Sequence, residues 1–231
     1  MAIIHRTTLM PTKLELLTPW LPEQPWYLGG GRKPELARAG GFRLDDPQGE
    51  VGIELMVVTD TSGAQPVSYF VPLSYRGAPL DGAEHALIGT SEHGVLGRRW
   101  VYDGVHDPVV VAQLFALLLG EAVPQAQSES NVADPSVTSA FTGEGLSVTA
   151  VPTDVTHGPG VTDLVVPAAT PGVPSGHLTV RVRRALSADP QAPASARTSP
   201  DLGHVTAGWL LADGATARAP FVVVRDTAGQ L

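Results

Sequence analysis

The sequence predicts an α+β fold, in which an antiparallel sheet packs on one buried helix and a smaller all-β region follows. Three observations lead to this prediction. Two apolar runs around a short Ser-Gly turn predict a hairpin over residues 52–75. Residues 108–119 are apolar almost all round, as expected of a helix that is covered on most sides. After residue 135 only strand-like runs remain.

The first part of the chain supplies the sheet. Residues 2–9 are predicted to form a strand that ends before Pro11. Thr12 and Glu15 have the spacing of a capping box, which predicts a short helix over 13–21. Further strands are expected at 52–59, 67–75 and 98–103, where β-branched and aromatic residues are frequent.

The helix over 108–119 is the most clearly marked element. Asp107 is a good N-cap, Pro108 suits the first helical position, and Gly120 suits the position after the last turn. Leu114 lies at its centre and is expected in the core.

A polar stretch over 124–135 predicts a linker between two domains, 1–125 and 136–231. Strands of the second domain are expected at 137–141, 146–151, 164–166, 178–183, 204–211 and 219–225. The Pro-, Ala- and Ser-rich stretch 187–200 predicts a loop.

Composition excludes several classes of protein. The formal net charge of −8 is spread along the chain, so no basic face for a nucleic acid is expected. There are no cysteines, which excludes disulfides and thiolate chemistry. No apolar run approaches the roughly 20 residues of a membrane span, and no signal peptide is recognisable, so we expect a cytoplasmic protein. Arginine, alanine, glycine and proline far outnumber lysine, as is typical of high-GC bacterial genomes.

Two long segments carry a resemblance. Residues 3–27 read IIHRTTLMPTKLELLTPWLPEQPWY, and residues 88–108 read IGTSEHGVLGRRWVYDGVHDP. Both resemble the maltokinase N-terminal cap domain family, and the resemblance covers about residues 1–121. It implies a cystatin-like arrangement, in which a curved antiparallel sheet packs on a helix. In that family the cap precedes a kinase that phosphorylates maltose with ATP and feeds α-glucan synthesis.

The cap of that family carries no known chemistry. The resemblance therefore implies a non-catalytic accessory or regulatory protein of α-glucan or trehalose metabolism, whose partner is a sugar kinase or an α-glucan enzyme. Stand-alone caps often bear the label "1,4-alpha-glucan branching protein". A branching enzyme needs a catalytic barrel of typically ~250 residues, which exceeds the 231 residues present, so the label does not imply that activity.

The sequence lacks the parts that phosphoryl transfer requires. No lysine follows Lys33, no glutamate follows Glu144, and none of the seven histidines has an aspartate two positions on. We therefore expect neither enzyme activity nor a cofactor. Two alternatives stay open. Residues 136–231 faintly resemble a degenerate kinase upper lobe that binds nucleotide or sugar, with Arg181 or Arg183 near the place of a phosphate-pairing lysine. The chain could also serve as a dimeric scaffold.

Charged side chains near residue 100 are candidates for a ligand or interface site. Arg98 and Arg99, with Glu92, form either an anion pocket or ordinary surface ion pairs. His93, Asp103, His106 and Asp107 are residue types that bind Zn²⁺ or Mn²⁺, but Asp107 already serves as an N-cap, so no metal site is predicted. A pocket that gathers His93, Arg98, Arg99 and Asp103 would indicate a ligand.

Aromatic residues cluster with prolines near the N-terminus. Exposed Trp20, Trp26 and Tyr27 would stack on a sugar or anchor a partner. If they are buried, they clamp the first helix on the sheet.

Overall fold

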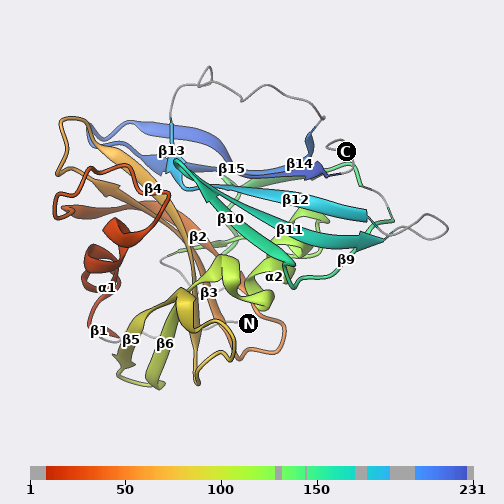
Figure 1. Ribbon diagram of the computed structural model, residues 1–231, viewed down its shortest axis with the longest axis horizontal. Coiled ribbons are helices and arrows are strands. Elements are labelled where there is room, and N and C mark those ends of the chain that lie inside the picture. The colour runs from red at the N-terminus through yellow and green to blue at the C-terminus, as the bar shows by residue number, and fades with distance from the viewer. Residues whose placement is uncertain (1–8, 128–131, 144, 170–175, 188–200, 228–231) are drawn as a thin grey trace.

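The computed structural model describes residues 9–127, 132–143, 145–169, 176–187 and 201–227. Within these residues the chain forms a strongly curved antiparallel sheet with two short helices, which is an α+β fold (Figure 1). The helices are α1 (Lys13–Trp20) and α2 (Pro108–Leu118). Neither these nor any other helix in the described ranges is long and apolar enough to cross a membrane.

Strands of the first part are β1 (Leu9–Met10), β2 (Leu36–Asp45), β3 (Gly52–Asp60), β4 (Val67–Arg76), β5 (Leu87–His93), β6 (Gly97–Asp103) and β7 (Gln125–Ala126). The second part contributes β8 (Thr138–Phe141), β9 (Ser147–Val148), β10 (Asp154–Gly158), β11 (Val161–Ala169), β12 (Gly176–Arg183), β13 (Ala185–Leu186), β14 (Asp201–Leu210) and β15 (Thr216–Asp226). Short 3₁₀ turns are η1 (Leu21–Glu23), η2 (Glu84–Ala86) and η3 (Gly104–His106).

The predicted hairpin is confirmed as β3 and β4, which pair along their whole length. The predicted strands near the C-terminus are confirmed as β12, β14 and β15. The sequence does not predict strands β2, β5, β7, β10 and β13, and β7 lies within the stretch 124–135 that is expected to be a linker. The expected strand over 2–9 and the expected loop over 187–200 fall outside the described residues, apart from Leu9 and Ser187.

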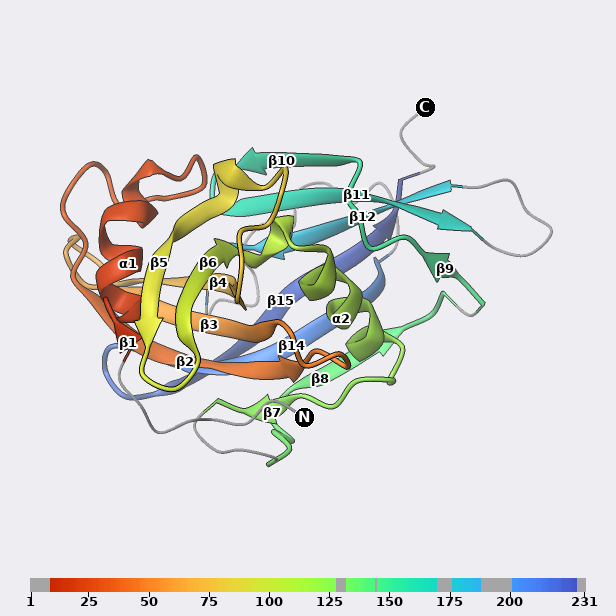
Figure 2. The same cartoon turned by 90° about the horizontal axis from the view of Figure 1, so that it is seen from below.

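The path of paired strands returns on itself. It runs β4–β3–β2–β14–β15–β12, and after Arg184 the chain continues from β12 as β13, which pairs with β4. The backbone N–H of Phe70 on β4 donates to the carbonyl of Arg184 at 2.8 Å, which extends this seam. The strands therefore form a closed ring, which joins the first and second parts of the chain at β13–β4 (Figure 1) and at β2–β14 (Figure 2).

Two glycines let β2 sit between its neighbours. Gly40 and Gly41 have φ values of 147° and 123°, where other residues are strained. A Cβ atom at Gly41 would lie 2.2 Å from the carbonyl oxygen of Leu55 on β3. Gly40 pairs with Trp209 of β14, and the register of β2 against β3 shifts between Arg38 and Gly40. Glycine at these positions thus permits the close approach that closes the ring.

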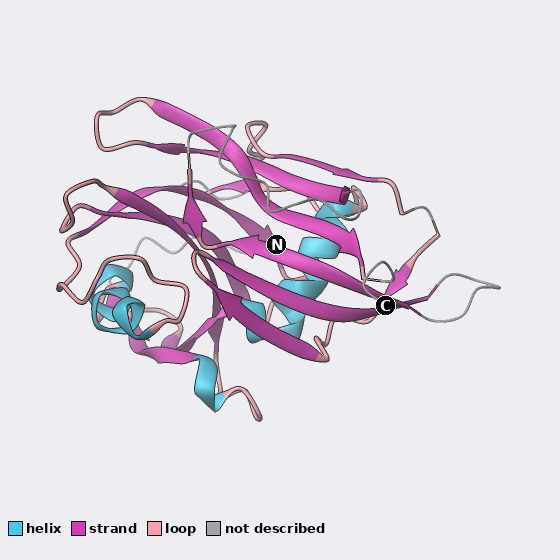
Figure 3. Cartoon of the chain, turned by 45° about the horizontal axis from the view of Figure 1, so that its top comes forward, coloured by secondary structure: helices cyan, strands magenta, loops and turns pink. Residues whose placement is uncertain are grey.

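The core has two main layers, one on each face of β3. Ile53, Leu55 and Val57 pack with α2 and with strands of the second part. Met56 and Val58 face the opposite way and pack with α1. The alternation follows from the period of a strand, which sends successive side chains to opposite faces. In Figure 3 the two helices accordingly lie on different sides of the sheet.

Both helices begin at the predicted caps. The Oδ1 atom of Asp107 accepts from the backbone N–H of Val109 at 3.0 Å. At the other end of α2, Gly120 (φ 76°) donates to Leu117 at 3.2 Å and Glu121 donates to Ala116 at 2.7 Å, which is a Schellman motif. The capping box of Thr12 and Glu15 is also present. Helix α1 ends at Trp20, one residue earlier than predicted, and the chain continues as η1.

Candidate functional site

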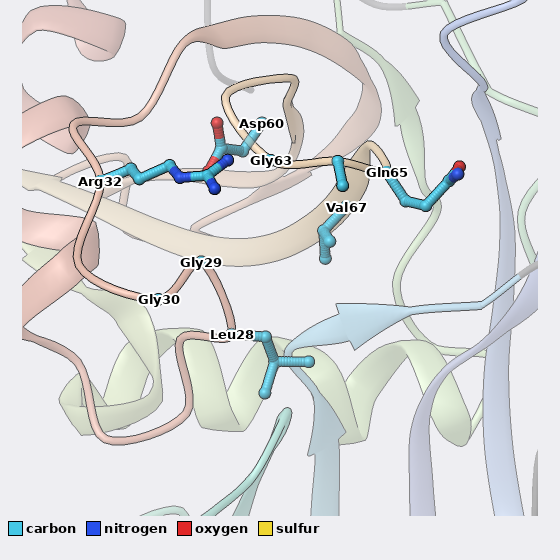
Figure 4. Close-up of a pocket in the computed structure, with 9 residues that line it drawn as sticks. Leu28, Gly29, Gly30, Arg32, Asp60, Gly63, Gln65 and Val67 are labelled. Atoms are coloured by element: carbon cyan, nitrogen blue, oxygen red, sulfur yellow. The ribbon is translucent and has the colours of Figure 1, made fainter.

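The loop that follows η1 borders two hollows that share Arg32 in their lining, and Figure 4 shows the smaller of them. The smaller hollow has a volume of about 260 Å³ and lies between this loop and the β3–β4 turn. It is lined by Leu28, Gly29, Gly30, Arg32, Asp60, Gly63, Ala64, Gln65 and Val67. The larger hollow, about 920 Å³, lies between the loop and α1. It is lined by Glu15, Thr18, Pro19, Pro22, Gly31, Arg32, Lys33, Pro34 and Glu35. We call the two together the Arg32 cleft.

Asp60, at the end of β3, fixes the wall of this cleft. Its carboxylate is almost fully buried and accepts from Tyr27 Oη at 2.7 Å, Glu35 N at 3.0 Å and Ser62 N at 2.9 Å. Burial works to raise the pKa of Asp60, but these hydrogen bonds outweigh it and hold the pKa below its ordinary value. Arg32 Nη1 donates to the carbonyl of Ser62 at 3.1 Å, and Figure 4 shows its side chain extended toward Asp60.

The aromatic residues near the N-terminus pack beneath the cleft. The rings of Trp20 and Trp26 are 5.7 Å apart, and Tyr69 of β4 lies 6.1 Å from Trp26 and 5.3 Å from Tyr27. Trp26 has no exposed surface and Trp20 is buried. Tyr27 is half-buried, with its hydroxyl bound to Asp60. The two tryptophans therefore act as a clamp between α1 and the sheet, and their faces are not available to a sugar.

The four charged candidates near residue 100 do not come together. His93, Arg98 and Arg99 lie around the β5–β6 turn, whereas Asp103 ends β6 at the opposite end of that strand. His93 Nδ1 accepts from the backbone N–H groups of Val95 at 3.2 Å and Leu96 at 3.0 Å. His93 therefore stabilises the backbone of the β5–β6 turn.

The two arginines of this turn make local contacts. Arg98 Nε donates to Glu92 at 2.8 Å, and both side chains are more than half exposed, so they form an ordinary surface ion pair and not an anion pocket. Arg99 Nη2 donates to the carbonyl of Leu96 at 2.8 Å. The ion pair of Arg98 with Glu92 joins two residues that lie directly opposite one another on β6 and β5.

Asp103 instead belongs to a buried ion pair that was not predicted. Arg184 Nη2 donates to Asp103 Oδ2 at 2.6 Å, and neither side chain has appreciable exposure. The guanidinium also donates to Thr162 at 2.9 Å and lies 4.6 Å from the centre of the Trp26 ring. The alternation of side chains along β12 indicates that Arg184 is buried. Leu178, Val180 and Val182 point inward, and Arg184 continues this series of every second residue.

Asp107, Pro108 and Leu114 have structural places. Asp107 caps α2, and its carboxylate accepts hydrogen bonds from Nη2 and Nε of Arg76 at 2.6 and 2.7 Å. Pro108 occupies the first turn of α2, and Leu114 is buried in the core. Across the described ranges, no group of three or more histidine, aspartate or glutamate side chains is arranged to hold a metal ion.

Comparison with known proteins gives one finding. No curated protein matches the chain. One family model matches, that of the maltokinase N-terminal cap domain, over residues 20–107. The matched segment runs from Trp20 at the end of α1 to the N-cap of α2 and contains most of the residues that line the Arg32 cleft. Residues 20–107 of this chain are thus similar to the maltokinase N-terminal cap domain, which confirms the resemblance seen in the sequence.

Proposed function

We propose that the chain is a non-catalytic accessory or regulatory protein, in which the cap-like segment binds an enzyme of α-glucan or trehalose metabolism through the Arg32 cleft. The match over residues 20–107 carries this proposal, because it is the finding that links the chain to a metabolic context. The cystatin-like arrangement of the matched segment is part of the same proposal.

The use of cations within the fold supports a non-catalytic role. Arg181 is one of the two arginines that the faint resemblance to a kinase upper lobe puts near the place of a phosphate-pairing lysine, and it is held by Asp163 through two hydrogen bonds of 2.8 and 2.6 Å. Lys13 binds the buried carboxylate of Glu54 at 2.5 Å. Arg181 and Lys13 are thus both engaged in ion pairs with neighbouring strands, which favours a structural role for these cations over the positioning of a triphosphate.

The chemistry of the Arg32 cleft suits a protein partner. Arg32 and Lys33 line the larger hollow together with Glu15 and Glu35, so its rim carries both signs of charge. Interfaces of moderate affinity commonly have such polar rims, and the charges there set orientation and association rate.

Calorimetry with purified enzymes tests the proposal. We expect a maltokinase-type kinase or an α-glucan enzyme to bind the full chain, and Arg32→Glu with Lys33→Glu to weaken that binding by about tenfold. The matched control is Arg98→Glu, which also reverses an exposed charge but lies on the β5–β6 turn. Equal weakening by both variants, or no binding of either enzyme, would contradict the proposal.

Calorimetry also tests the alternative that residues 136–231 are a degenerate kinase upper lobe that binds nucleotide or sugar. Heat on addition of ATP–Mg²⁺ or maltose to the full chain alone would favour a ligand-binding lobe over a protein-binding module. Light scattering decides the scaffold alternative, because a dimeric scaffold requires twice the mass of one chain.

A further inference from the structure

Three histidines from separate elements lie in a row outside the Arg32 cleft. His85 is on η2, His106 ends η3, and His157 is on β10. The ring centres of His85 and His106 are 4.6 Å apart, and those of His106 and His157 are 6.2 Å apart. In Figure 2 the end of β10 lies close to η2, the 3₁₀ turn that carries His85 and leads into β5. The row thus connects the matched segment to the second part of the chain.

The buried guanidinium of Arg184 lies next to this row of histidines. Arg184 pairs with Asp103 and donates to the hydroxyl of Thr162, which in turn is 3.1 Å from His157 Nδ1. Asp103 and Arg184 act electrostatically on both His106 and His157, and Asp103 is the carboxylate among these groups. Asp103 offsets Arg184 in part at His106 and His157, and Glu84 is the carboxylate that acts on His85, so protonation of His106 and His157 adds positive charge beside a cation that is already buried.

The hydrogen bonds of the row also limit how many of its rings can carry a charge. His85 Nε2 and His106 Nδ1 are 3.2 Å apart, so one nitrogen donates while the other accepts through a lone pair. Two imidazolium rings would place two N–H groups against each other. The simplest assignment at Thr162 has its oxygen accepting from Arg184 and its proton donated to His157 Nδ1, which is possible only while that nitrogen is bare.

Burial lowers the pKa of His106 and of His157 below the ordinary value of 6.5. Arg184 and the neighbouring histidines lower both further, while Asp103 opposes the shift. As pH falls through 6.5, the unfolded chain therefore binds protons before the folded chain does. The stabilisation is complete above pH 6.5 and is lost progressively below it, until the pH reaches the lowered values of the folded state.

We propose that His85, His106 and His157 form a proton-operated latch that holds β10 against η2 and η3 at neutral pH and releases it in mildly acidic solution. Opening frees the contact between the segment 84–106 and β10, while the β3–β4 hairpin and α2 remain packed. The latch depends on these side chains and on the adjoining Arg184, Asp103 and Thr162, and it holds whether or not the Arg32 cleft binds a partner.

Hydrogen exchange of the full chain tests the latch, with rates corrected for the intrinsic effect of pH. Between about pH 7.5 and about pH 5.5, we expect roughly tenfold loss of protection in peptides covering 84–106 and 154–162, but not in peptides of β3. His106→Gln with His157→Gln should remove this difference. His177→Gln is the matched control, because His177 is exposed on β12 away from the row and should keep the wild-type response.

Three results would overturn the latch: equal loss of protection in β3, an unchanged response in the double variant, or loss of the response in His177→Gln. If the double variant does not fold, NMR titration of the wild-type imidazoles replaces it. There, a pKa of His106 at or above the ordinary 6.5 contradicts the proposal, and a value below it agrees.

Discussion

Arg184 carries a charge that is completely buried in the fold. Its side chain has no exposed surface, and its contacts are Asp103, Thr162 and the face of Trp26. Forming a buried ion pair costs desolvation of both groups, whereas removing one partner leaves an uncompensated charge inside the protein. Arg98 and Glu92 are the opposite case, since both remain in contact with water.

We predict that Asp103→Ala lowers the free energy of unfolding by about 3–5 kcal/mol, because Arg184 would be left buried and unpaired. Urea denaturation followed by circular dichroism measures this loss. The control Glu92→Ala breaks the exposed pair with Arg98 and should cost no more than about 1 kcal/mol. Similar losses in the two variants would mean that Asp103 does not carry the charge of Arg184.

Elements with local signals were predictable, and elements defined by distant contacts were not. Helix α2 was found because Asp107, Pro108 and Gly120 mark its ends within the sequence itself. The sequence does not predict strand β2, because Gly40 and Gly41 weaken a strand pattern and the need for them arises only from the approach of β3 and β14.

The candidate site follows the same rule. The capping role of Asp107 was predictable from its neighbours, whereas its ion pair with Arg76 and the pairing of Asp103 with Arg184 depend on how strands meet. The row of His85, His106 and His157 gathers three separate elements, so no spacing in the sequence indicates it. The Arg32 cleft likewise depends on how the loop after η1 lies against α1 and the β3–β4 turn.

At the scale of elements, α2 is expected to be the least tolerant of added charge. Leu114→Asp should lower the free energy of unfolding by about 3–5 kcal/mol, because it removes packing and buries a carboxylate in an apolar interior. The control Leu119→Asp makes the same exchange at the exposed end of the helix and should cost well under half as much. Thermal midpoints compare the two, and a wild-type midpoint for Leu114→Asp would contradict the burial of that face.

The whole molecule is held together by shared strands and a shared core. The ring closes through β2–β14 and β13–β4, and both seams join residues of 1–125 to residues of 136–231. Leu114 and Ile53 belong to the same buried cluster as Val180 and Phe221. A disturbance of the core in one part should therefore be felt in the other.

Leu114→Ala tests this coupling, with an expected cost of about 2–5 kcal/mol. Hydrogen exchange across a urea series gives separate midpoints for peptides of β3 and of β12. In the wild-type chain we expect the two midpoints to coincide, because the strands surround one core. In Leu114→Ala both should fall by the same amount, although β12 lies far from residue 114 in the sequence. A fall confined to β3 would mean that the two parts unfold as independent domains, and that the seams of the ring do not transmit stability between them.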